Sequence, residues 1–163
     1  MTPRTSAGIL LYRHRDGNRE VLLVHPGGPF FGHKDQGNWS IPKGEHDAED
    51  GDYETTARRE FLEETGHAVP EVPLIDLGSI RQRGGKVVFA WAVEADLDSA
   101  TMSSNFIEFE WPPFSGRVKR FPEVDKWVYF GHDEARLKIK ETQIPLLNRL
   151  DDILDGSGEA DAR

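Results

Sequence analysis

Apolar runs separated by turn residues predict the first elements of the chain. Residues 7–12 and 21–24 are apolar and flank Asp16-Gly17, and an Asp-Gly pair between apolar runs is a β-hairpin signal. Residues 39–41 form a short strand candidate that Pro42 stops. The N-terminal part of the chain is therefore predicted to supply a hairpin, then a Gly/Pro-rich loop and a short strand.

A second hairpin is predicted between residues 74–83 and 86–95. Its turn is Gly84-Gly85, and residues 87–92 alternate between two faces of a strand. Residues 96–122 read as one long loop, and a strand is expected near residues 126–130. The pattern thus predicts a β-rich middle of the chain with one long unstructured connection.

Helix signals appear at three places. Asp52 can cap a helix that runs to Thr65, and Gly66 can terminate it. A helical region begins at Asp133, and an apolar helix covers about residues 144–154. The chain is predicted to be an α+β protein with mixed strands, a single domain over residues 1–154, and a small, charged, flexible tail over 155–163.

Composition narrows the class of protein. The chain has 163 residues, enough for one buried core, and a formal net charge of -9, which disfavours non-specific binding to nucleic acid. It has no cysteine, which excludes disulfides and thiolate chemistry. No apolar run is long enough to cross a bilayer and no signal peptide is recognised, so a cytoplasmic location without a membrane partner is the expectation.

Three carboxylates stand out on the helix that Asp52 caps. Glu60, Glu63 and Glu64 are spaced i, i+3 and i+4, so they share one face and repel one another. Mg²⁺ or Mn²⁺ would relieve the repulsion, because hard cations bind carboxylate oxygens. Arg59 can orient or neutralise one of them. Taken alone, the spacing favours a solvated acidic helix face, because Glu-Glu pairs on helices are common.

A wider constellation favours the metal. Pro42-Lys43-Gly44 follows the strand candidate, then an acidic loop, then the helix. The stretch from Gly44 to Gly66 resembles the signature box of the Nudix (MutT-type) hydrolase family, through Arg59, Glu60, Phe61, Glu63, Glu64 and Gly66. The resemblance implies an α/β/α sandwich with a mixed sheet, the box helix against it and a C-terminal helix.

The box departs from the family pattern in its first half. The connection between Gly44 and Arg59 is one residue longer than in the family. Gly51 also stands where the family has a glutamate, and Glu49, Asp50 or Asp52 could supply the missing carboxylate. The box carboxylates on the helix are unchanged, so we interpret both departures as local variation.

The resemblance also implies roles for the box residues. The carbonyl of Gly44 and the side chains of Glu60 and Glu64 would hold Mg²⁺, with Mn²⁺ as the other option. Glu63 would hold a second ion or act through its water, and Arg59 would fix the carboxylates. The reaction implied is attack of water on phosphorus in a diphosphate linkage.

A general base is expected outside the box. In MutT-type relatives it can come from a loop before the strand that leads into the C-terminal helix, and Glu123 has a similar offset here. Glu108 and Glu110 are rivals in the same predicted loop. An exposed loop carboxylate is an equally good interpretation of each.

The substrate is expected to be a small nucleotide. Trp39 to Glu45 resembles diadenosine-polyphosphate hydrolases, which makes such a compound the first prediction and a nucleoside triphosphate the next. A nucleotide sugar such as ADP-ribose, a diphosphoinositol polyphosphate, and a non-catalytic nucleotide-binding regulator are the alternatives.

Lys43 and Arg81 are predicted to contact substrate. The loop at Trp111 could serve a homodimer interface or a substrate lid. The remaining basic candidates are Lys34, Arg83 and Lys86.

Overall fold

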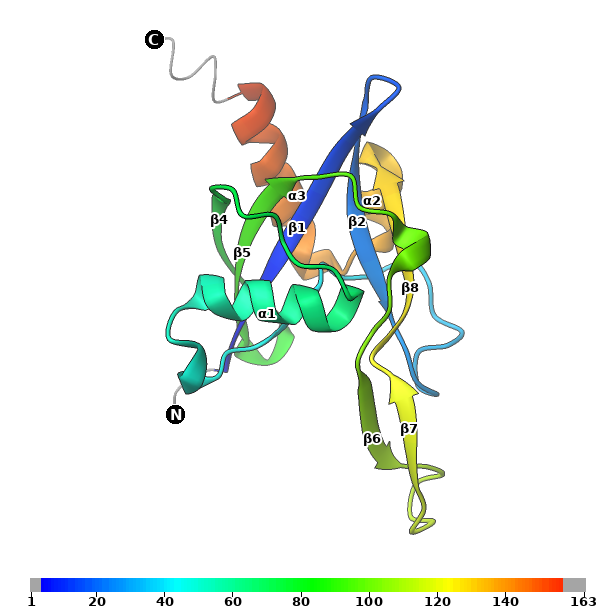
Figure 1. Ribbon diagram of the computed structural model, residues 1–163. Helices are drawn as coiled ribbons and strands as arrows, with labels where there is room; N and C mark the ends of the chain where they lie inside the picture. Colours follow the sequence, from blue (N-terminus) through cyan, green and yellow to red (C-terminus); the bar gives the residue numbers. More distant parts are fainter. Residues whose placement is uncertain (1–3, 157–163) are drawn as a thin grey trace.

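A mixed β-sheet organises the molecule. The computed structural model describes residues 4–156 and places the main strands in the order β4-β5-β1-β2-β8, with the short strand β3 beside β1 (Figure 1). β1 and β5 run parallel, and every other neighbouring pair in this sheet is antiparallel. The bounds are β1 Thr5–Arg15, β2 Asn18–Pro26, β3 Lys43–Glu45, β4 Ile75–Arg81, β5 Val87–Glu94 and β8 Val124–Gly131.

Helices cover both faces of this sheet. The helix α1 (Tyr53–Thr65) packs on one face, while α2 (His132–Lys138) and α3 (Ile144–Asp151) cover the other. Neighbouring residues of β1 point to opposite sides: Ile9 joins the α1 core and Leu10 the α3 core, and both are fully buried. The predicted α/β/α sandwich with a mixed sheet and a C-terminal helix is therefore confirmed.

Local sequence signals produce the expected ends of these elements. The side chain of Asp52 accepts the Thr55 N–H, and Gly66 ends α1 in the left-handed conformation at φ 77°. The predicted hairpin at Asp16-Gly17 joins β1 to β2, and the Gly84-Gly85 turn joins β4 to β5. Short helical turns lie at Ala48–Asp50, Arg83–Gly85, Ser99–Thr101 and Glu141–Gln143.

The prediction of one long loop over residues 96–122 is wrong. This segment contains a two-stranded hairpin, β6 (Phe106–Glu110) and β7 (Val118–Pro122), which projects beyond the main sheet (Figure 1). Its strands are short and pair only with each other. Neither contains an apolar run from which a strand could have been predicted. Residues 39–41 form two isolated bridges, with Val24 and Ile139, in place of the predicted strand.

The C-terminal helix continues beyond its α-helical part. α3 passes into a π-helical turn at Asp152–Gly156, where Asp155 accepts hydrogen bonds from Arg19 at 2.8 and 3.0 Å. The first two residues of the predicted tail thus belong to a helical turn, and the rest, 157–163, lie outside the described residues. Within residues 4–156, no helix has the length and apolar character needed to cross a membrane.

Candidate active site

Two carboxylates of the box are buried beneath α1. Glu60 and Glu64 are 8% and 4% exposed, because α1 packs against the strands β1 and β3. Gly44 makes this approach possible: a Cβ atom at Gly44 would lie 1.8 Å from Oε1 of Glu60. The glycine therefore leaves a cradle that the Glu60 carboxylate fills.

Arg59 ties the acidic groups together. Its Nη1 donates to Glu60 Oε2 at 2.6 Å and to Glu63 Oε2 at 2.7 Å. Its Nε and Nη2 donate to the two oxygens of Asp50 at 2.9 and 2.8 Å. Of the three carboxylates left open by the sequence, it is Asp50 that pairs with Arg59, and this pairing holds the pKa of Asp50 well below its usual range.

Burial and like charge work against ionisation at the box. Burial raises the pKa of Glu60 to about 6, with Glu63 adding to the shift and Arg59 opposing it. Burial also raises the pKa of Glu64 well above its ordinary value, helped by Glu123 and Glu60. The protein thus gathers carboxyl groups that are costly to ionise without a cation nearby.

Glu123 lies at the base of the projecting hairpin, next to the box. Its Oε1 accepts a hydrogen bond from Asn105 Nδ2 at 2.9 Å, and its backbone N–H donates to Asn105 O at 3.0 Å. The Asn105 N–H in turn donates to Glu63 O at 2.8 Å, which anchors this pair to α1. The rivals lie out on the hairpin, where Glu108 faces Arg120 and Glu110 accepts the backbone N–H groups of Phe114 and Gly116.

A cavity of about 180 Å³ joins these groups. Lys43, Glu64, Glu123 and Lys140 all line it, together with residues at the end of β2 and the start of β8. Burial lowers the pKa of Lys43 to about 8, and the positive charges of Lys140 and Lys86 add to the shift. Among the described residues, the ammonium groups of Lys43 and Lys140 make no hydrogen bond or ion pair. The cavity therefore brings two unpaired cations, Lys43 and Lys140, close to the buried carboxylates.

Of the predicted site residues, Lys43, Glu64 and Glu123 line this cavity, and the other box residues adjoin it through α1 and β3, whereas Arg81 lies apart. Its Nη1 donates to Gly85 O at 3.3 Å, within its own hairpin, and it does not line this cavity. Lys140 and Asn105 are the residues that sequence reasoning missed. Neither lies in a motif, since each reaches the site through the tertiary fold alone.

The donor set fits a hard divalent cation of the kind that the box resemblance implies. In the part of the chain that the structure describes, no group of three acidic or histidine side chains forms a complete metal cage. Mg²⁺ does not need one, because it is usually held by one or two carboxylates, waters and substrate phosphates. Glu60, set against the Gly44 cradle, and the buried Glu64 supply such a pair of carboxylates.

Comparisons with known proteins agree with this geometry. A family model described as NUDIX domain matches residues 2–150. Similar solved structures include the NUDIX domain of Shewanella oneidensis NrtR complexed with ADP ribose, with a TM-score of 0.68, 17% identity, and 94% and 90% of the two chains covered. A C. elegans Ap4A hydrolase gives 0.64 at 21% identity, covering 94% and 98%.

A mutT/nudix family protein from Listeria innocua is also similar, with a TM-score of 0.63, 17% identity, and 98% and 99% of the two chains covered. No curated protein matches the sequence. At these identities the solved structures establish the shared fold, and the substrate has to be argued from the site itself.

Proposed function

Because the chain belongs to the NUDIX domain family, we propose that it is a metal-dependent hydrolase of a nucleoside diphosphate linked to a second group. The cleaved bond is a phosphoanhydride, and the preferred substrate is a diadenosine polyphosphate, followed by a nucleoside triphosphate. The observation that carries the proposal is the single cavity in which Lys43 and Lys140 face Glu64 and Glu123. Such a cavity suits a polyanion that arrives together with a cation.

The metal would be Mg²⁺, with Mn²⁺ as the other option. Glu60, Glu64 and the carbonyl of Gly44 would hold it, and Glu63 would hold a second ion or orient water. When bound, the ion offsets charge that develops on the phosphate oxygens and acidifies the attacking water. Arg59 keeps the carboxylates oriented, because it is itself fixed by the two oxygens of Asp50.

Glu123 is the general base in this proposal. Asn105 occupies its Oε1, which leaves Oε2 to take a proton from water as the water oxygen attacks phosphorus. The new P–O bond forms as the bond to the bridging oxygen breaks, and the leaving phosphate departs with the bridging electrons. Lys43 and Lys140 pair with the phosphate oxygens on either side.

Hydrolysis assays test this function directly. The protein is incubated with Mg²⁺ and a panel of diadenosine tetraphosphate, ATP, ADP-ribose and a diphosphoinositol polyphosphate, and the released species are separated and quantified. We expect turnover of diadenosine tetraphosphate first and ATP second, and loss of both in Glu60→Gln. Glu134→Gln, on the exposed start of α2, is the matched control and should keep full activity.

Two results would overturn the proposal. Faster turnover of ADP-ribose or the diphosphoinositol would give the site to one of those substrates. No turnover of any compound, by wild type and Glu60→Gln alike, would make the protein a nucleotide-binding regulator instead of an enzyme.

A further inference from the structure

A second, larger cavity adjoins the one beside the box. It has a volume of about 490 Å³ and shares Asn38 and Lys140 with the smaller cavity. Its other walls come from the β4–β5 turn, the loop after β2 and the link between α2 and α3, with Phe31, Arg83 and Thr142 among the lining residues. Lys140 therefore stands on the boundary between two compartments of one groove.

Size divides the substrate between the two compartments. Cavities that hold small molecules or cofactors usually measure about 300–1,000 Å³. The compartment beside the box, at about 180 Å³, falls below that range and suits a short run of phosphates. The outer compartment, at about 490 Å³, lies within it. A nucleoside attached to the phosphates therefore fits the outer compartment and not the inner one.

The outer compartment also has the chemistry of a nucleoside site. Phe31 is 38% exposed and offers an aromatic ring on which a base can stack. The side-chain carbonyl of Gln82 is occupied, because Gln143 Nε2 donates to Gln82 Oε1 at 3.0 Å. The side-chain N–H groups of Gln82 remain available to a ligand. Gln143 is fully buried, which fixes this orientation.

Charge continues from one compartment into the other. Lys140 is half-buried, and burial followed by the charge of Lys86 lowers its pKa. Arg83 is exposed at the rim, and within residues 4–156 its guanidinium makes no hydrogen bond or ion pair. An anion that enters past Arg83 thus meets Lys140 and then Lys43, with Glu141 as the carboxylate among the residues that line the outer compartment.

We propose that the outer compartment binds the nucleoside of the substrate, with Phe31 and Gln82 contacting the base and Lys140 contacting the phosphate that joins it to the inner compartment. This inference rests on the proposed function, because it assigns the inner compartment to the reacting phosphates. It identifies the recognised group as a base joined to two or more phosphates.

Two ligands that differ only in the nucleoside test the proposal. Titration calorimetry in EDTA measures the binding of ATP and of inorganic tripolyphosphate to the intact protein without cleavage. Thr142→Trp fills the outer compartment, and Arg83→Met removes charge at its rim. We expect Thr142→Trp to weaken ATP binding about tenfold and Arg83→Met about threefold, while neither changes tripolyphosphate binding by more than about twofold.

Lys119→Met is the matched control, because Lys119 is exposed on β7 and lines neither cavity. It should leave both affinities unchanged. Equal affinities of wild type for ATP and tripolyphosphate, or parallel changes for the two ligands in both variants, would overturn the proposal. Since binding is measured without turnover, selective loss of ATP affinity in a protein that hydrolyses nothing would support this site while the hydrolase function fails.

Discussion

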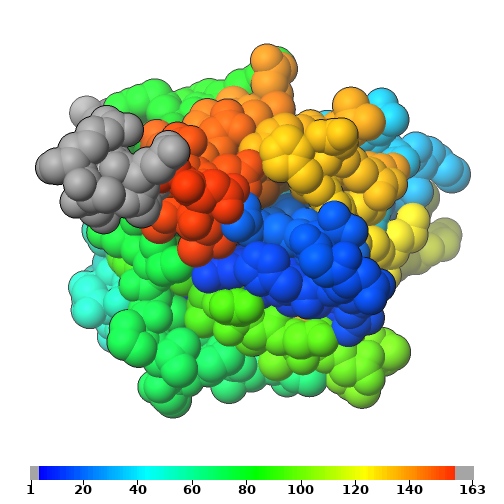
Figure 2. Space-filling model, turned by 90° about the horizontal axis from the view of Figure 1, so that it is seen from above, coloured from blue at the N-terminus to red at the C-terminus, as the bar shows by residue number. Residues whose placement is uncertain are grey.

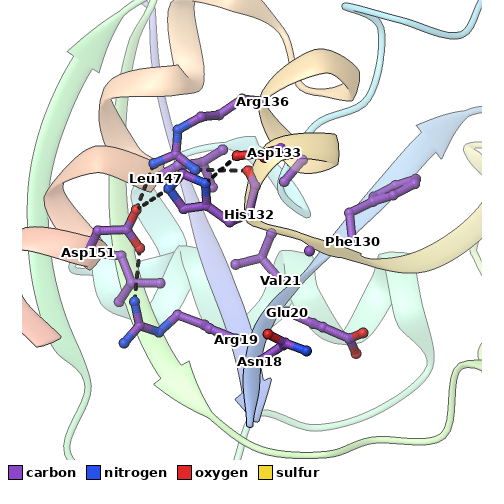
Figure 3. Close-up of a pocket in the computed structure, with 13 residues that line it drawn as sticks. Asn18, Arg19, Glu20, Val21, Phe130, His132, Asp133, Arg136, Leu147 and Asp151 are labelled. Atoms are coloured by element: carbon purple, nitrogen blue, oxygen red, sulfur yellow. Dashed lines mark hydrogen bonds and ion pairs between the residues drawn. The ribbon is translucent and has the colours of Figure 1, made fainter. Parts of the chain in front are cut away.

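Two hollows lie at opposite ends of the same pair of strands. One is the small cavity beside the box, at the end of β2 and the start of β8. The other, of about 340 Å³, is lined by the start of β2, the end of β8 and the helices α2 and α3 (Figure 3). Figure 2 shows this second end, where the tip of the β1–β2 hairpin lies beside the C-terminal helical turns. On β2, the far hollow is lined by residues 18–21 and the small cavity by Val24 and Pro26, so Leu22 and Leu23 lie between them.

The two hollows differ in whether their charged side chains pair with one another. In the far hollow, Asp151 lies between Arg19, Arg136 and His132 at 3.0, 2.7 and 3.3 Å (Figure 3). These charges neutralise one another and fasten α3 to the first hairpin. Beside the box, by contrast, the ammonium groups of Lys43 and Lys140 pair with nothing among the described residues. The smaller hollow is thus the candidate active site, and the larger one serves stability.

The largest effect is expected at the proposed base. Glu123→Gln keeps the hydrogen bond from Asn105 but cannot take up a proton, so kcat should fall by about 10³-fold while metal affinity stays unchanged. Steady-state kinetics with metal titration measure both. Full turnover in Glu123→Gln, together with lost turnover in Glu108→Gln or Glu110→Gln, would move the base to the outer hairpin.

Two glycine-to-alanine substitutions, one beside each hollow, compare how tightly the two regions are packed. Gly44→Ala places a Cβ 1.8 Å from Oε1 of Glu60, so the carboxylate must move and activity should fall by about 100-fold. Gly131→Ala, in the far hollow, meets nothing within 4 Å and should keep full activity. Hydrolysis rates of the two variants, with thermal melts to check folding, measure the contrast. Similar rates in both variants would contradict the role of the Gly44 cradle.

Asp151→Ala should affect stability and leave activity unchanged. It removes the shared partner of Arg19 and Arg136, and the free energy of unfolding should drop by about 1–3 kcal/mol. Urea unfolding gives this value, and KM for the substrate should stay constant. A raised KM without loss of stability would show that the far hollow binds substrate.

Lys43→Met tests the unpaired cations. It replaces a half-buried ammonium with an apolar side chain of similar length, so the fold should survive while KM rises about tenfold, or ~1.4 kcal/mol. The same assay on Lys119→Met supplies the baseline. Unchanged KM in Lys43→Met would mean that the phosphates bind elsewhere.

The smallest effect is expected from acid at the far hollow. The hydrogen bond from Arg19 lowers the pKa of Asp155 in the folded protein, so this pair stabilises the fold above the ordinary aspartate pKa and loses its contribution as the pH falls through the lowered value. Asp155→Asn should therefore slightly reduce the acid dependence of the urea midpoint below the ordinary aspartate pKa. An unchanged pH profile in Asp155→Asn would contradict the assignment.

Local signals explain which parts of the fold the sequence could predict. The cap at Asp52, the end at Gly66 and the turn at Asp16-Gly17 each act within a few residues, and all three lie where they were expected. The β6–β7 hairpin was missed because Phe106 and Glu108 share its exposed face, so its alternation does not separate apolar from polar. Pairing between short strands depends on register, which no single run reveals.

In the candidate site, too, only the residues that lie close together in the sequence could be predicted. The helical spacing of Glu60, Glu63 and Glu64 could be predicted, since it follows from one helix. Choosing Asp50 as the partner of Arg59 required the path of the loop before α1, and finding Asn105 required the hairpin base to fold against Glu63. Residues that reach a site from distant elements leave no spacing for the sequence to show.

Amide NMR shows whether the hollow with unpaired charges binds the nucleotide. Diadenosine tetraphosphate is titrated in EDTA into protein labelled with nitrogen-15, and shifts are followed at both ends of β2. Saturable shifts are expected at Lys43, Gly44 and Glu123, and none at Arg19 or Asp151. Shifts confined to Arg19 and Asp151 would contradict this expectation.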